Sequence, residues 1–361
     1  MKKRIFAMLL CLCMALSLLP NTASAADGTT VEMGGARLTS YEYYKIEEST
    51  LKRCNQTDAW NVYYAGINGI LTLNNFYYTA ITPYSTHGDV KAVLWADGDL
   101  TIHLKDNGED PNYYMIKADG GDDVHCAYIG GDLTVTAEAE FRLMFQGSNG
   151  TDRVRDPNES NEGGKGGTGL EVTGELMIKS PVTSVFAYGG EGGKGQDGVY
   201  ETSTGTGSDD YAAGNGGAGG AGFIGTLREG KLIANGGKGG NGGRLDSKKT
   251  YGSLAGGGRF GGAAFSGTIK GGEAILTGGK GGNGGALNAS VGGEYSFSGA
   301  GGSGGVGIGT NGVVTGGIII ATGGAAGAVG RVEGQYGSPN GEVINGPALL
   351  MQAFSYAEQP N

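Results

Sequence analysis

The chain has few cysteines, prolines and histidines: its 361 residues include four, eight and three of them, respectively. Cys11 and Cys13 lie within the first 25 residues, so a chain without that segment would keep only Cys54 and Cys126. A chain with at most one pair of cysteines cannot be a disulfide-rich scaffold. The sequence leaves open whether these two thiols pair. Because no histidine stands at ligand spacing from a cysteine, the usual zinc motifs are excluded as well.

The chain also has fewer basic than acidic residues. Against 36 acidic residues the chain has 26 basic ones, for a formal net charge of −10. Residues 2–4 are three of the basic ones, so the chain after residue 25 would carry 23 and a net charge of −13. Such an excess of negative charge disfavours nucleic acid and anionic membrane surfaces as partners. No apolar run of spanning length follows residue 25, so we expect no transmembrane segment there.

Residues 1–25 have the three parts of a secretory signal peptide. A basic start (residues 2–4) precedes the apolar run Ile5–Leu19, and Ala23–Ala25 forms an A-x-A cleavage site. We therefore expect a mature chain that begins at Ala26 and is secreted. It would be extracellular, either released or held non-covalently at the cell surface.

Glycine, by contrast, supplies 77 residues, far above its usual share of about 7%. The octapeptide Gly-Gly-Lys-Gly-Gly-Asn-Gly-Gly occurs at Gly236–Gly243 and again at Gly278–Gly285. Each copy follows a short apolar run. Collagen is excluded because no strict Gly-X-Y register holds. Full disorder is disfavoured because apolar residues recur at regular places between the glycines.

A five-residue signature, Gly-x-apolar-x-apolar, recurs along the chain. Its copies begin at Gly69, Gly98, Gly131, Gly174, Gly230, Gly272 and Gly317. Alternation with period two indicates a strand with one buried face. The predicted fold is all-β, a parallel β-helix in which stacked coils bury a continuous core. An antiparallel sandwich with Asn-Gly turns is the competing interpretation.

The identical offset within each copy predicts one interior file of side chains. Its members would be Leu71, Leu100, Leu133, Leu176, Leu232, Ala274 and Ile319.

Glycine-rich stretches leave the repeat and return to it, with polar segments between them. We expect these arms to form polyglycine II helices packed as a side layer, and flexible linkers are the alternative. The predicted organisation has four parts. They are a signal peptide (1–25), an N-terminal cap with the first coils (26–162), coils with glycine-rich arms and loop tips (163–346), and a C-terminal cap or tail (347–361).

The segment Gly69–Leu104 carries a resemblance to known proteins. Its Gly-Ile-Leu-Thr-Leu-Asn-Asn, followed by the signature at Gly98–Ile102, resembles secreted right-handed β-helix proteins of Gram-positive bacteria labelled carbohydrate-binding-domain-containing. The glycine arms are similar in architecture to the polyglycine II layers of glycine-rich phage tail-fibre adhesins and of a glycine-rich insect antifreeze protein. In the adhesins, loops at the tips of the glycine helices carry receptor recognition. The resemblance implies a binding scaffold and supplies no catalytic motif.

The tips between the arms are the candidate ligand-binding sites. Their aromatic residues are Tyr200, Tyr211, Tyr251, Tyr295 and Phe297, which stand among Ser, Thr, Asn, Asp and Lys. Tyrosine with short polar groups is typical of adaptable recognition surfaces, and aromatic rings stack on sugars. We therefore expect a glycan or another cell-surface component as the partner. The other interpretation is that these tyrosines only close the ends of the glycine layer.

A carboxylate follows three of the signature glycines, as Asp99, Asp132 and Glu175. Stacked coils would place them about 4.8 Å apart. That ladder is a weak candidate for calcium or for the carboxylate pair of a glycosidase, and a solvated outer face explains it more simply. No nucleophile motif or phosphate loop occurs. The prediction is a non-enzymatic binding or adhesion protein without a cofactor; a polysaccharide-active lyase or glycosidase and a self-associating matrix protein remain alternatives.

Overall fold

The computed structural model describes residues 28–74, 76, 78–81, 84–105, 113–154, 161–201, 212–248, 252–289 and 296–334. Within these ranges the chain is all-β, as predicted, and its one helix is the short 3-10 turn η1 (Gly66–Asn68). No helix in these ranges is long and apolar enough to cross a membrane. The strands form three sheets, here A, B and C, of 15, 7 and 4 strands.

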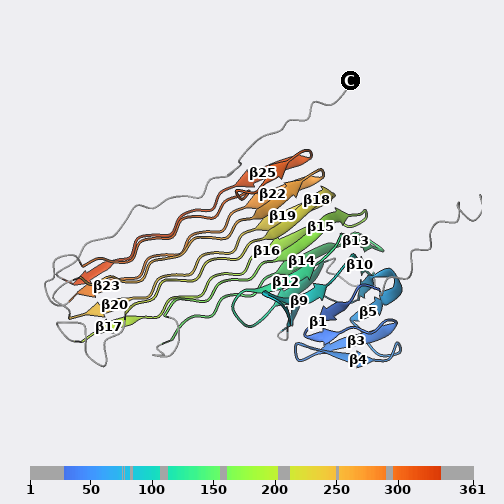
Figure 1. The fold of residues 1–361 in the computed structure, drawn as a ribbon, viewed down its shortest axis with the longest axis horizontal. Coiled ribbons are helices and arrows are strands. Elements are labelled where there is room, and N and C mark those ends of the chain that lie inside the picture. The colour runs from blue at the N-terminus through green and yellow to red at the C-terminus, as the bar shows by residue number, and fades with distance from the viewer. Residues whose placement is uncertain are drawn as a thin grey trace, which may run out of the picture.

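Sheet A begins with an antiparallel N-terminal part and continues as parallel strands (Figure 1). The antiparallel part contains β1 (Val31–Met33), β2 (Ala36–Arg37), β3 (Glu42–Glu47), β4 (Thr50–Cys54), β5 (Val62–Ala65) and β8 (Ser85–His87). The parallel part contains β6 (Ile70–Leu73), β9 (Val90–Ala96), β10 (Leu100–Leu104), β12 (Val124–Ile129), β13 (Leu133–Ala137), β15 (Leu170–Ile178), β18 (Phe223–Glu229), β21 (Phe265–Ile269) and β24 (Val313–Val314).

Sheets B and C are parallel throughout. Sheet B contains β7 (Tyr78–Ile81), β11 (Tyr113–Ala118), β14 (Arg142–Gln146), β16 (Ser184–Tyr188), β19 (Lys231–Asn235), β22 (Glu273–Thr277) and β25 (Ile318–Thr322). Sheet C contains β17 (Gly198–Tyr200), β20 (Leu245–Ser247), β23 (Leu287–Ala289) and β26 (Val332–Gly334). Long extended segments separate sheet C from the other two sheets (Figure 1).

The main core lies between sheets A and B, because alternate side chains of both sheets point inward and pack in one cluster. Leu100, Leu133 and Leu176 occupy one interior file, as the signature predicts. In the same core Phe223 stacks on Phe265 with ring centroids 5.3 Å apart. Burial of such aromatic and aliphatic side chains supplies the main driving force for stacking one strand on the next.

The rest of the predicted interior file is wrong. Leu71 lies opposite Ile102 rather than Leu100. Leu232 pairs with Val185 on sheet B and continues there to Ala274 and Ile319. The signature thus passes from sheet A to sheet B after its fourth copy, and the file in sheet A continues with Leu227. The cause is β15, a nine-residue strand that pairs with β12 through its first residues and with β13 through its last.

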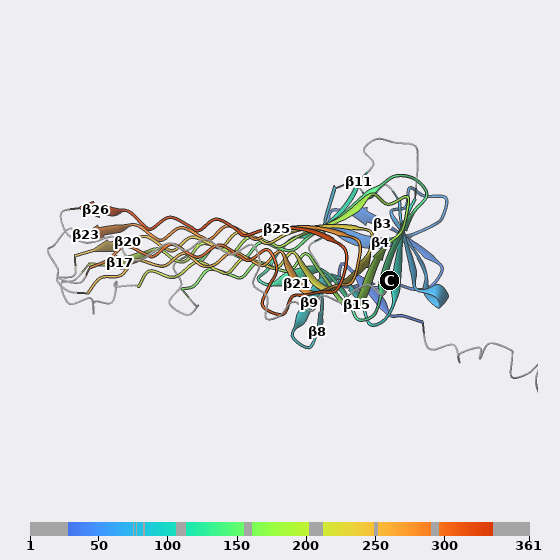
Figure 2. The same ribbon diagram turned by 90° about the horizontal axis from the view of Figure 1, so that it is seen from above.

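The glycine-rich segments form a thin slab of two layers (Figure 2). We call the segments that leave sheet B outgoing and those that lead back to sheet A returning. The outgoing segments are 147–154, 189–197, 236–244, 278–286 and 323–331. The returning segments are 161–169, 212–222, 255–264 and 299–307.

Backbone hydrogen bonds fix every segment to its neighbours with a period of three residues. Within the outgoing layer, the amides of Gly236 and Gly239 donate to the carbonyls of Thr277 and Lys280 at 2.9 and 2.8 Å. Between the layers, the amide of Gly240 donates to the carbonyl of Gly217 at 2.7 Å. The third residue of each triplet turns its side chain outward. A Cβ atom on most of the other two would contact neighbouring backbone, which explains why glycine stands there.

Cys54 and Cys126 are free thiols in this fold, and Cys126 is buried. Its thiol donates to the Ile116 carbonyl oxygen, 3.1 Å away, and burial raises the pKa of the Cys126 thiol to about 12. Because the thiolate is the reactive form, we expect a thiol-specific reagent to modify Cys54 in the native chain without residues 1–25. Cys126 should react only after denaturation, as a quantitative thiol assay with and without denaturant would measure. Equal native rates for both thiols, or no free thiol in denaturant, would contradict the buried free cysteine.

Candidate functional site

Sheet C closes the distal end of the slab with a small hydrophobic core of its own. Leu245 and Leu287 are fully buried there, together with Ala255 and Ala289. The connections that follow β17, β20 and β23 therefore start from an ordered sheet. A rigid support of this kind is where binding loops are usually placed.

Two of the five predicted tip residues lie in the described structure. Tyr200 is half-buried in β17, opposite Ser247, and packs against the distal core. Phe297 is half-buried and forms an isolated parallel bridge with Leu254, which is 56% exposed. Both positions are thus at the distal end, and Tyr200 also contributes to its packing. The other three candidates, Tyr211, Tyr251 and Tyr295, lie outside the described residues.

In the carboxylate ladder of Asp99, Asp132 and Glu175, the first two carboxylates each accept a hydrogen bond from a backbone amide of the next signature copy. Asp99 Oδ1 accepts a hydrogen bond from the amide of Asp132 at 2.7 Å, and Asp132 Oδ1 accepts one from the amide of Glu175 at 2.8 Å. Hydrogen bonds and positive charge from Lys270 and Arg228 hold the pKa of the Glu175 carboxyl below its usual value. Each carboxylate therefore has a protein partner. Among the described residues no three potential ligands form a metal-binding group.

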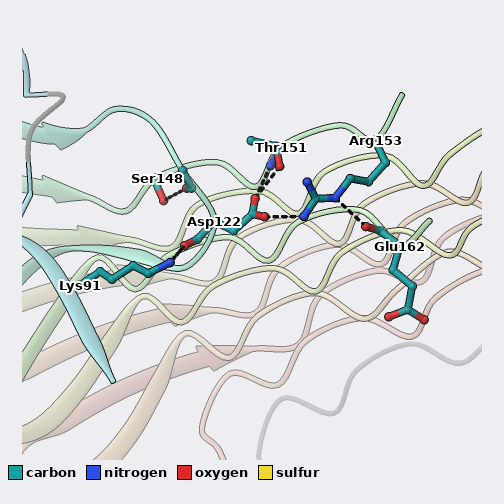
Figure 3. Close-up of polar contacts among 7 residues, drawn as sticks. Lys91, Asp122, Ser148, Thr151, Arg153 and Glu162 are labelled. Carbon is teal, nitrogen blue, oxygen red and sulfur yellow. Dashed lines mark hydrogen bonds and ion pairs between the residues drawn. The ribbon is translucent and has the colours of Figure 1, made fainter. Parts of the chain in front are cut away.

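Asp122 fixes the first outgoing and returning segments to the sheets (Figure 3). Its Oδ1 accepts hydrogen bonds from the Thr151 amide and hydroxyl, both at 2.7 Å, and its Oδ2 pairs with Arg153 at 2.9 Å. Arg153 Nε in turn donates to the Glu162 carbonyl oxygen at 3.1 Å. A Cβ atom on Gly164 would lie 1.7 Å from Asp122 Oδ1. At this edge the slab has no further glycine segment. The Asp122 carboxylate therefore accepts the hydrogen bonds of the donors that stand there.

Two open grooves lie on the outward side of sheet B. The larger, of about 430 Å³, runs onto the outgoing layer, and the smaller, of about 350 Å³, lies toward the starts of the strands. The larger is lined chiefly by Met115, Gln146, Tyr188, Glu191, Lys238 and Lys280. The smaller is lined by Arg142, Thr183, Ser184, Phe186, Lys231 and Ile233. Sequence reasoning missed both grooves, because they depend on which strands lie side by side.

A second group of aromatic side chains lies at the N-terminal end of the fold, and its partial exposure could not be predicted from the sequence. The rings of Tyr43 and Tyr63 lie 4.6 Å apart, and Trp60 meets Tyr43 edge-on at 5.2 Å. Lys105 Nζ stands 5.3 Å from the centroid of the Trp60 ring. All three aromatic side chains are half-buried, so part of each faces solvent. Exposed rings of this kind can stack on sugars.

Comparisons with known proteins add little. No family model matches the chain, and no curated protein matches it. Among solved structures, the chain is similar to a nine polyproline type II helical bundle springtail antifreeze protein from Granisotoma rainieri, at 25% identity. The alignment covers 52% of this chain and 94% of that protein, with a TM-score of 0.16. At that TM-score the likeness carries no argument about this chain.

Proposed function

We propose that this protein is an exported, non-enzymatic binding or adhesion protein. Sheets A and B would be two sides of a parallel β-solenoid, and the slab would be a layer of polyglycine II helices that holds recognition loops away from it. The parallel register of successive strands supports the solenoid. The three-residue period of the slab's hydrogen bonds supports polyglycine II, which has three residues per turn.

The ordered distal sheet is the observation that carries the binding function. Sheet C has its own buried side chains, although it lies at the far end of the slab from the main core (Figure 1). The segments that follow β17, β20 and β23 contain Tyr211, Tyr251 and Tyr295. They vary in length and composition, whereas the strands and glycine segments must repeat in order to stack. Tyrosine offers a large contact area at low entropic cost, and its ring stacks on sugars. We therefore propose a glycan or another cell-surface component as the ligand.

Replacing Tyr211, Tyr251 and Tyr295 together by serine tests this function. We expect the triple variant to lose binding on a glycan array or to intact bacterial cells by about 100-fold or more, because several aromatic anchors usually carry most of the binding energy. Thermal unfolding should change little, since the three tyrosines belong to the variable segments of the sequence and not to the repeated signature. Array binding and a melting curve on the same preparation measure both expectations.

The matched control replaces two exposed tyrosines remote from the tips, Tyr41 and Tyr84, by serine. That control should bind like the wild-type chain. A triple tip variant that binds normally would contradict the proposed site. Recognition would then have to lie elsewhere, for example on the N-terminal aromatic group or beside the carboxylate ladder.

A further inference from the structure

An apolar row crosses the outward side of sheet B. Register places one residue from each of six neighbouring strands in line, and all six are hydrophobic. They are Met115, Met144, Phe186, Ile233, Ile275 and Ile320. We call this row the outer stripe. Hydrophobic side chains on the solvent side of a sheet are unusual in such an unbroken line, and larger exposed apolar patches mark interaction sites.

Among the described residues the outer stripe is partly exposed to solvent: Ile320 is exposed, and its other five members are half-buried. Ile320 is 55% exposed and Ile318, two residues earlier in β25, is 66% exposed. The two grooves described above lie on either side of the stripe, and Met115, Phe186 and Ile233 line them. Burial of this surface in a partner would remove apolar area from water, and this favours association.

We infer that the outer stripe is where a second copy of this chain docks face to face. The two copies would be related by a two-fold axis that runs parallel to the strands and passes between β16 and β19. This operation places Phe186 against the second copy's Ile233 and Met144 against the second copy's Ile275. Closed two-fold interfaces of this kind are the commonest form of self-assembly.

Charged residues beside the stripe fit this arrangement. Glu191 follows β16 by three residues and Lys238 follows β19 by three residues. The axis therefore brings Glu191 of one copy opposite Lys238 of the second copy, and Lys238 of the first opposite Glu191 of the second. Arg142 and Glu273, the first residues of β14 and β22, meet in the same way, and Glu273 also pairs with Lys231 of its own chain at 2.9 Å. Neither Glu191 nor Lys238 forms an ion pair within the described chain. Complementary charge of this kind fixes orientation and discriminates against other arrangements.

The flat face is large enough for a stable dimer. Six strands about 4.8 Å apart span about 24 Å across the stripe. Along the chain, a five-residue strand followed by a nine-residue outgoing segment spans about 44 Å. Their product is about 1,000 Å² per copy, compared with the roughly 800 Å² that each partner buries in a standard interface.

Reciprocal charge reversal provides the test. Sedimentation velocity should show a concentration-dependent dimer of the purified wild-type protein. Glu191→Lys places two lysines opposite each other at two places in the dimer, and Lys238→Glu places two glutamates there. Each variant alone should dimerise at least about tenfold more weakly. An equimolar mixture of the two restores both opposite-charge pairs and should recover the wild-type affinity. Matching melting curves for all samples would show that the fold is intact.

Three outcomes would overturn this inference. One is a wild-type chain that stays monomeric at about 100 μM, well above the micromolar dissociation constants at the weak end for an interface of this size. The second concerns residues 335–361, which contain the apolar segment Ala348–Phe354. A chain ending at Gly334 that dimerises when the full chain does not would show that the C-terminal segment of the same molecule occupies the stripe. Loss of dimer in both charge variants without recovery in the mixture would likewise reject the proposed axis.

Discussion

Gly282→Ala should disrupt the glycine slab more than any change at an outward position of the same segment. A Cβ atom at residue 282 would lie 1.9 Å from the Gly240 carbonyl oxygen, and that oxygen belongs to backbone fixed by its own hydrogen bonds. The Gly282 amide also donates to the Arg259 carbonyl at 2.8 Å. Relief of the clash must separate the segments and break such bonds. We expect a loss of about 3 kcal/mol or more in the free energy of unfolding, at the upper end of overpacking effects.

Hydrogen exchange and thermal unfolding measure this effect. Amides of Gly278–Gly285 should exchange slowly in the wild-type chain and much faster in Gly282→Ala. The matched control is Lys280→Ala, two residues earlier, where the side chain is exposed and alanine removes only its charged end. If both variants exchange like the wild-type chain, the segments are not packed as closely as these contacts require.

Much of the secondary structure could be predicted from the sequence. The apolar residues of every copy of the signature lie in a strand, from β6 after Gly69 to β25 after Gly317, because alternating apolar residues favour a half-buried strand. The assignment of strands to sheets could not be predicted in the same way. Leu176 and Leu232 each stand two residues after a signature glycine, so the sequence makes them look equivalent. In the structure Leu176 lies in sheet A and Leu232 in sheet B.

The candidate sites show the same limit. The sequence indicates that Asp99 and Asp132 recur at one position, but not that the Asp99 carboxylate accepts the Asp132 amide. That contact depends on the path of the backbone at the corner. The outer stripe was missed for a related reason, because Phe186 and Ile233 are 47 residues apart and become neighbours only through strand register. Local patterns therefore predicted strands and turns, whereas sites built across strands required the register.

Leu133→Ala is expected to cost about 2 to 5 kcal/mol in the free energy of unfolding, the usual range for a buried leucine truncated to alanine. Leu133 is fully buried in the file between Leu100 and Leu176, so the cavity has rigid neighbours on both sides. Thr134→Ala, the next residue along the strand, is the control, since its side chain points outward and its loss should cost well under half as much. Chemical denaturation of both variants measures the difference.

A double-variant cycle then tests the register itself. Leu133 and Leu176 are direct neighbours in sheet A, so truncation of both should merge two cavities and give a coupling energy of about 0.5 to 3 kcal/mol. Leu232 stands in sheet B beside Val185, so truncation of Leu133 and Leu232 should give effects that add within about 0.5 kcal/mol. Equal coupling in the two cycles would mean that all three leucines share one file. The passage of the signature from sheet A to sheet B would then be incorrect.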